Sequence, residues 1–141
     1  MNGQSVTAEE EFSTLPITTN DDVVRARQLV RALAQQAKLS LVDQTKLITA
    51  ASELARNTLV HGGGGVMRSG LVERGGRRGV TARFEDSGPG IPDLDLALTD
   101  GWTSGNGMGL GLSGARRLTD DFTLASKPGA GTTVSITKWV R

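Results

Sequence analysis

The sequence lacks cysteine altogether and contains a single histidine, His61. Disulfide bonds, thiol catalysis and cysteine-based metal sites are therefore excluded, and one imidazole without partner ligands does not make a metal site. His61 follows a predicted helix, where we expect it to satisfy free carbonyl groups rather than to act in catalysis. The absence of cysteine fits a reducing compartment.

The chain also lacks a long apolar run and a strong charge of one sign. No stretch is long enough to cross a bilayer, and residues 1–11 are polar and acidic, unlike a signal peptide. The formal net charge of +1 provides no field that would attract nucleic acid or a membrane. One predicted hairpin is locally basic, but no aromatic residues interleave with its arginines, which argues against nucleic acid. We expect a cytoplasmic protein without nucleic-acid or membrane partners.

What is present is the composition of one globular domain. The chain has 141 residues, of which 37% are hydrophobic and 22% are charged. We expect a flexible tail over residues 1–10 and a single domain over residues 11–141. The 19 glycines are not periodic, so they indicate functional loops rather than collagen or a linker. They cluster at 61–65, 74–79, 86–90 and 101–114.

Hydrophobic periodicity predicts five strands and three main helices. Pro16 indicates that the first strand lies at an edge of the sheet, because proline has no backbone N–H to donate to a neighbouring strand. Asp43 is expected to cap the second helix. The predicted strands are 11–18, 66–73, 80–85, 122–126 and 132–140. The first predicted helix starts within 19–22 and has an apolar face that runs to residue 37, and the other two predicted helices are 44–60 and 111 to about 119.

The predicted helix 44–60 carries a polar pair, Glu53 and Asn57. The two residues are four positions apart, so they share one face, just beside the apolar stripe. A carboxylate and an amide one turn apart can serve a metal ion and its phosphate ligand. Two solvated side chains on a surface helix are the alternative, and the helix alone does not decide between them.

A turn-forming segment follows the third predicted strand, at residues 86–90 (Asp-Ser-Gly-Pro-Gly). The carboxylate of Asp86 can accept a hydrogen bond from an adenine amino group. Gly88 and Gly90 let the backbone pass close to a base. The same residues are good turn formers, so a plain turn remains equally open.

Residues 105–111 alternate glycine with Asn106, Met108 and Leu110 before the third predicted helix. Backbone N–H groups at such a loop and helix start form a phosphate cradle. The pattern is neither a Walker A loop nor a Rossmann fingerprint.

In this order, the polar pair, the 86–90 turn, the 105–111 loop and the Gly-Thr-Thr of 131–133 resemble the ATP site of the GHKL superfamily. That superfamily includes gyrase, Hsp90, histidine kinases and MutL. With Glu-Leu-Ala-Arg-Asn at 53–57, the chain resembles the RsbT-type serine/threonine kinases of the anti-sigma regulatory factor family, from about residue 12 to 139. The resemblance implies the Bergerat fold, an α/β (α+β) two-layer sandwich. Its sheet would be mixed and mostly antiparallel, with helices on one face and a short ATP lid over 92–105.

The resemblance also implies a role for each candidate residue, with ATP and Mg²⁺ as cofactors. Glu53 would be the general base, Asn57 would hold Mg²⁺, and Asp86 would read the adenine. The glycine-rich loop would cradle the phosphates, and one or both threonines of the last strand would line the adenine pocket. The other implied ATP-binding residues are Gly88, Gly90, Gly105, Gly107, Met108, Gly109, Leu110, Gly111, Thr132 and Thr133.

The function implied is phosphorylation of serine or threonine on STAS-domain proteins of a stressosome. The kinase would then bind and activate a PP2C-type phosphatase in a partner-switching stress response. One alternative is an anti-sigma factor that binds a sigma factor and phosphorylates an anti-anti-sigma factor. Another is a nucleotide-gated binding module without catalysis, against which the presence of both Glu53 and Asn57 argues. A lone histidine disfavours a histidine kinase fragment.

Overall fold

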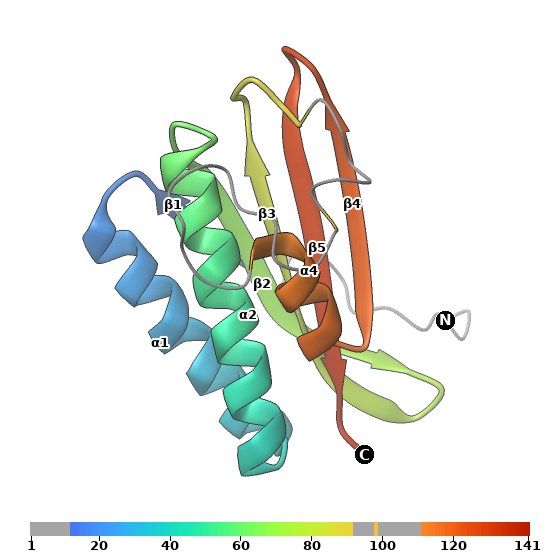
Figure 1. Cartoon of the computed structure of the whole chain (residues 1–141). Helices are drawn as coiled ribbons and strands as arrows, with labels where there is room; N and C mark the ends of the chain where they lie inside the picture. The colour runs from blue at the N-terminus through green and yellow to red at the C-terminus, as the bar shows by residue number, and fades with distance from the viewer. Residues whose placement is uncertain (1–11, 92–97, 99–110) are drawn as a thin grey trace.

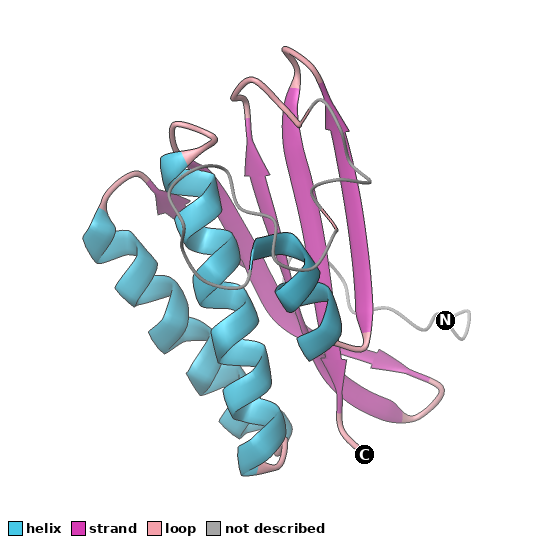
Figure 2. Cartoon of the chain, in the orientation of Figure 1, coloured by secondary structure: helices cyan, strands magenta, loops and turns pink. Residues whose placement is uncertain are grey.

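The computed structural model describes residues 12–91, 98 and 111–141. The predicted tail, most of the predicted lid and most of the predicted phosphate loop lie outside the described residues. Among the predicted site residues, this applies to Gly105, Gly107, Met108, Gly109 and Leu110. The described chain forms two layers, a five-stranded sheet with three helices against one of its faces (Figure 1). The predicted α+β sandwich is confirmed, and Figure 2 shows the helix layer on one side of the strands. None of the helices described is long and apolar enough to cross a membrane.

The described sheet is antiparallel throughout, although the prediction allowed for a mixed sheet. Gly75 and Gly76, both with positive φ, join two strands in a tight hairpin, as predicted. The strand order is β1-β2-β3-β5-β4, so the last strand inserts between the third and fourth and the proline-containing first strand lies at an edge. The strands are β1 (Ser13–Ile17), β2 (Gly65–Arg74), β3 (Arg77–Asp86), β4 (Asp121–Lys127) and β5 (Gly131–Trp139).

The helix layer consists of α1 (Asn20–Ala37), α2 (Leu41–Val60) and α4 (Gly111–Leu118). The start of α1 is a capping box, in which the Thr19 hydroxyl accepts a hydrogen bond from the Asp22 backbone N–H at 3.2 Å. These capping side chains fix where the chain leaves β1 and begins α1.

The prediction that Asp43 caps the second helix was wrong. The cap is Ser40, whose hydroxyl accepts a hydrogen bond from the Asp43 backbone N–H at 3.1 Å, so α2 begins three residues earlier than expected. The Asp43 side chain is thereby free to turn inward, and the residue is buried. Its role is in tertiary packing rather than in capping.

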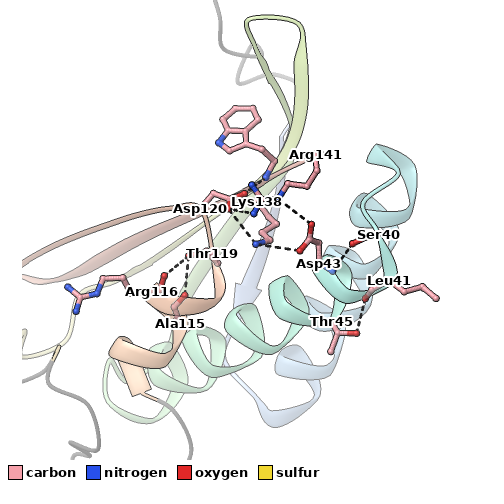
Figure 3. A network of polar contacts seen from close by, with 11 residues as sticks. Ser40, Leu41, Asp43, Thr45, Ala115, Arg116, Thr119, Asp120, Lys138 and Arg141 are labelled. Atoms are coloured by element: carbon pink, nitrogen blue, oxygen red, sulfur yellow. Dashed lines mark hydrogen bonds and ion pairs between the residues drawn. The ribbon is translucent and has the colours of Figure 1, made fainter.

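A buried ionic network joins α2, the start of β4 and the end of β5 (Figure 3). The Lys138 side chain is only 4% exposed, and its Nζ lies 3.6 Å from Asp43 Oδ1 and 3.4 Å from Asp120 Oδ1. Arg141 contacts the same two carboxylates, at 3.7 Å and 2.7 Å. Burial by itself raises the pKa of Asp120. Hydrogen bonds from the Trp139 N–H and Arg141, with the charges of Lys138 and Arg141, outweigh burial and lower that pKa.

The hydrophobic core lies between the sheet and the helices, and it fixes which strand residues face the site. Phe84 of β3 is 2% exposed and Val134 of β5 lies opposite it, both within the core. Side chains alternate along a strand, so Asp86 and Thr132, each two residues away from one of these, lie on the same helix-facing side. The core therefore aims both side chains toward the helix layer.

Candidate functional site

The helix α2 places Glu53 and Asn57 as the sequence predicts, one turn apart on a continuous helix. Both residues are half-buried, and the neighbouring Ala50 and Leu54 are buried in the core. The core thus holds this side of α2 against the sheet while leaving a carboxylate and an amide accessible at its edge. The pair lies in the last two turns of the helix, at the end of the molecule where β3 also finishes.

The C-terminal end of α2 packs directly against the end of β3. The Gly62 backbone N–H donates to the carbonyl oxygen of Asn57 at 3.1 Å, which folds the chain back over the helix end. A Cβ atom at Gly62 would collide with the Asp86 carboxyl group, and one at Gly88 would lie 2.8 Å from Gly62 Cα. Glycine at both positions is therefore what lets the motif on α2 and the 86–90 turn meet.

Asp86 lies at this junction, where one of its carboxylate oxygens accepts a hydrogen bond. Its Oδ1 accepts a hydrogen bond from the Gly88 N–H at 2.9 Å, which closes the turn expected from the sequence. Within the described part of the chain, Oδ2 has no hydrogen-bond partner. A half-buried carboxylate with an oxygen that no described residue engages is suited to an amino group of a ligand.

Asp86 is one of three polar residues that form a row across neighbouring strands of the sheet. Thr132 of β5 pairs with Asp86 of β3, and Ser126 of β4 pairs with Thr132. Thr133 follows Thr132 in the strand, so its side chain points to the opposite face of the sheet. Of the two candidate threonines, the structure brings only Thr132 to the side of Asp86.

The segment after Asp86 is held against the turn between β4 and β5. The Gly129 N–H donates to the Pro89 carbonyl at 2.7 Å, and the Ile91 N–H donates to Ser126 Oγ at 2.8 Å. Gly90 has a φ of 79°, and a Cβ there would collide with the Lys127 carbonyl oxygen. Sequence reasoning missed Ser126. The pairing of Ser126 with Thr132 across the β4–β5 hairpin is the signal that could have found it.

Of the predicted phosphate loop, only Gly111 lies within the described residues, as the first residue of α4 with a φ of 64°. Across residues 12–91, 98 and 111–141, no group of three or more histidine, aspartate or glutamate side chains could hold a metal ion. The metal ligand expected from the resemblance is Asn57 alone. So small a donor set fits Mg²⁺, which keeps most of its sites for phosphate oxygens and water.

Known proteins are similar to this chain in sequence and in fold. Residues 42–141 match the family of histidine kinase-, DNA gyrase B- and HSP90-like ATPases. The serine/threonine-protein kinase RsbT of Bacillus subtilis (strain 168) is 42% identical over 92% of this chain and 97% of its own length. An anti-sigma F factor of Thermoanaerobacter sp. (strain X514) is 28% identical over 82% of this chain and 83% of its own.

The crystal structure of the RsbU and RsbW domains of Rv1364c from Mycobacterium tuberculosis has a similar fold. It superposes with a TM-score of 0.59 at 22% identity, over 89% of this chain and 32% of that longer one. The matched family model and the 42% identity to a kinase of nearly the same length show the family of this chain. The chain belongs to the histidine kinase-, DNA gyrase B- and HSP90-like ATPase family, and within it to the RsbT-type serine/threonine-protein kinases.

Proposed function

We propose that this kinase transfers the γ-phosphoryl group of ATP to a serine or threonine of a STAS-domain protein. The observation that carries the proposal is the direct packing of the end of α2 on the Asp86 turn. It brings the end of the helix that carries Glu53 and Asn57 close to the base-reading candidate Asp86, which supports the proposal. The relative RsbT, named as a serine/threonine-protein kinase, supports the reaction type.

The residues at the end of β3 fit an adenine nucleotide. The Oδ2 of Asp86 can accept a hydrogen bond from the exocyclic amino group, and Thr132 adds a hydroxyl on the same face. Added Cβ atoms at Gly62, Gly88 and Gly131 would all collide with neighbouring atoms, so side chains are kept out of this region. A flat ring then has backbone and small groups as its walls.

The polar pair on α2 would serve the phosphate end of the nucleotide. Asn57 would hold Mg²⁺, which neutralises charge on the phosphates when bound. Glu53 would accept or orient the proton of the incoming hydroxyl as general base. Phosphoryl transfer passes through a loose transition state, so positioning contributes more than base strength. The predicted loop from Gly105 to Gly111 would cradle the phosphates with its N–H groups.

The partner-switching role is the wider part of the proposal. The substrate would be a STAS-domain protein of a stressosome, after whose phosphorylation the kinase would bind and activate a PP2C-type phosphatase. The kinship with RsbT, and the shared fold with a structure that contains RsbU and RsbW domains, support a place in such a system. An anti-sigma factor is the second candidate, favoured by the 28% identity to anti-sigma F factors.

Phosphotransfer tests the reaction directly. The protein is mixed with Mg-ATP and a STAS-domain protein encoded beside it, and added phosphate is located by mass spectrometry. We expect phosphate on a serine or threonine, none with Asp86→Asn, and none with Glu53→Gln despite intact ATP binding. Transfer that persists in Glu53→Gln would contradict the assigned base. Co-purification with a sigma factor instead of the STAS and PP2C partners would select the anti-sigma reading.

A further inference from the structure

The hydroxyl of Ser126 makes three polar contacts at the end of β4. It accepts a hydrogen bond from the Ile91 N–H at 2.8 Å, and it lies 3.2 Å from the Gly131 carbonyl oxygen. It also lies 2.9 Å from Thr132 Oγ1, where either hydroxyl could be the donor. A serine hydroxyl has one proton to donate and two lone pairs to accept with. Three contacts therefore use its full capacity and leave one consistent arrangement.

The carbonyl oxygen of Gly131 decides the direction of each bond. A carbonyl can only accept, so the contact with Gly131 requires Ser126 to donate its single proton there. The N–H of Ile91 can only donate, so it takes one lone pair of Ser126. The bond to Thr132 must then run from the threonine hydroxyl into the second lone pair of Ser126.

This direction has a consequence for the face that Thr132 shares with Asp86. With its proton committed to Ser126, Thr132 Oγ1 presents only lone pairs to its surroundings. The row then offers hydrogen-bond acceptors alone, from the carboxylate of Asp86 and from Thr132. Acceptors match an amino group on a purine ring and repel a carbonyl oxygen in the same place.

We propose that Ser126 is a positioning residue that fixes Thr132 as an acceptor and thereby selects a 6-amino purine over a 6-oxo purine. The inference rests on the proposed function, because it takes the base to lie at Asp86. Ser126 also ties Ile91 and Gly131 together, so one hydroxyl both anchors the segment after Asp86 and sets the polarity of the site.

The test compares the dissociation constants of Mg-ATP and Mg-ITP by calorimetry, since these nucleotides differ at the 6-position of the base. We expect Ser126→Ala to lower the preference for ATP about fivefold, the size of one neutral hydrogen bond, because the freed Thr132 hydroxyl can then donate to the 6-oxo group. Ser126→Thr keeps the hydroxyl and should keep the preference. Ser135→Ala, an equal truncation on the outer face of β5, is the matched control.

Two further variants separate the possible failures. Thr132→Val removes the acceptor with little change in volume, and it should lower the preference as Ser126→Ala does, without an additive effect in the double variant. If Ser126→Ala weakens both nucleotides equally while Asp86→Asn lowers the preference, Ser126 is only structural and the inference is overturned. If the wild-type protein binds neither nucleotide, or Asp86→Asn leaves the preference intact, the proposed base site itself fails.

Discussion

The two ends of the sheet are built from different interactions. At the end that holds the candidate site, glycines let backbone segments touch, and the bonds across the Ser126 row are between neutral groups. At the other end, Lys138 is buried between Asp43 and Asp120, with Arg141 outside them. Buried charges hold one end together, whereas glycine at the other end lets backbone segments approach closely with no side chains between them. The glycine-rich end suits a nucleotide, and the end with buried charges stabilises the fold.

The helix α2 connects the two ends. Asp43 lies in its first turn, within the ionic network, and Glu53 and Asn57 lie in its last two turns. At 1.5 Å per residue, the 20-residue helix carries this anchoring over roughly 30 Å. The helix that carries the polar pair is therefore held at its far end by the ionic network.

Lys138→Met should have the largest effect, because it leaves two carboxylates without their buried cation. We expect a loss of about 3 kcal/mol in the free energy of unfolding, measured by urea denaturation. ATP affinity at low temperature should change less than twofold, since the site is at the other end. Lys46→Met on the exposed side of α2 is the control and should stay within about 0.5 kcal/mol. Equal losses in the two variants would show that the network contributes nothing.

Gly90→Ala should have the reverse effect, a moderate loss of stability and a large loss of binding. Its Cβ would be placed in a left-handed backbone conformation and against the Lys127 carbonyl, so we expect about 2 kcal/mol of destabilisation. ATP affinity should fall at least tenfold by calorimetry, because the 89–91 segment must move. Gly75→Ala has the same backbone cost with nothing within 4 Å, so binding should be unchanged. Normal ATP binding by Gly90→Ala would contradict this account.

Asp22 tests the comparison between the two ends, because it is a charged residue with several hydrogen bonds at the site end. Hydrogen bonds, first that from the Thr18 backbone N–H, lower the pKa of Asp22 from 3.8 to about 2. The unfolded chain therefore binds this proton more readily, so stability falls as the pH drops from about 4 to about 2. Asp22→Asn should be less stable than wild type at pH 7, and the gap should narrow below about pH 4 and close towards about pH 2. Urea midpoints at pH 7, 4 and 2.5 measure it, and a gap that widens in acid would refute the assignment.

Arg74→Met should have the smallest effect, although Arg74 belongs to the charged end. Its guanidinium lies 5.0 Å from the Trp139 ring centroid and 3.9 Å from Asp121, and its side chain is largely exposed. Solvent screening limits such contacts to about 0.5 kcal/mol, measurable as a small shift in the urea midpoint. Arg77→Met, at the exposed first residue of β3, is the control. If Arg74→Met lost as much stability as Lys138→Met, solvent exposure would not explain the difference between the contacts of Arg74 and those of Lys138.

Local patterns in the sequence predicted most of the fold. The Gly75-Gly76 turn, the helical face of Glu53 and Asn57 and the edge strand with Pro16 each depend on residues close together in the chain. Such signals are local, so periodicity and turn chemistry reveal them.

The features that were missed depend on pairing between distant segments. Asp43 looked like a helix cap because nothing near it in the sequence reveals Lys138, which approaches from the last strand. Ser126 gave no signal of its own, since its role follows from the register with Thr132 and the approach of Ile91. The choice between Thr132 and Thr133 likewise needed the strand register, because a one-residue shift reverses the face.

The position of β5 between β3 and β4 also determines when the site comes into being. Asp86 and Thr132 are neighbours across the sheet, yet α4 and β4 lie between them in the chain. Closing so long a loop costs more entropy than closing the β2–β3 hairpin, so we expect the pairing of β3 with β5 to form late in folding. During synthesis, the nascent chain would expose its first hairpin and two helices well before it could hold a nucleotide. Recognition of ATP would then begin only after β5 leaves the ribosome and joins the sheet.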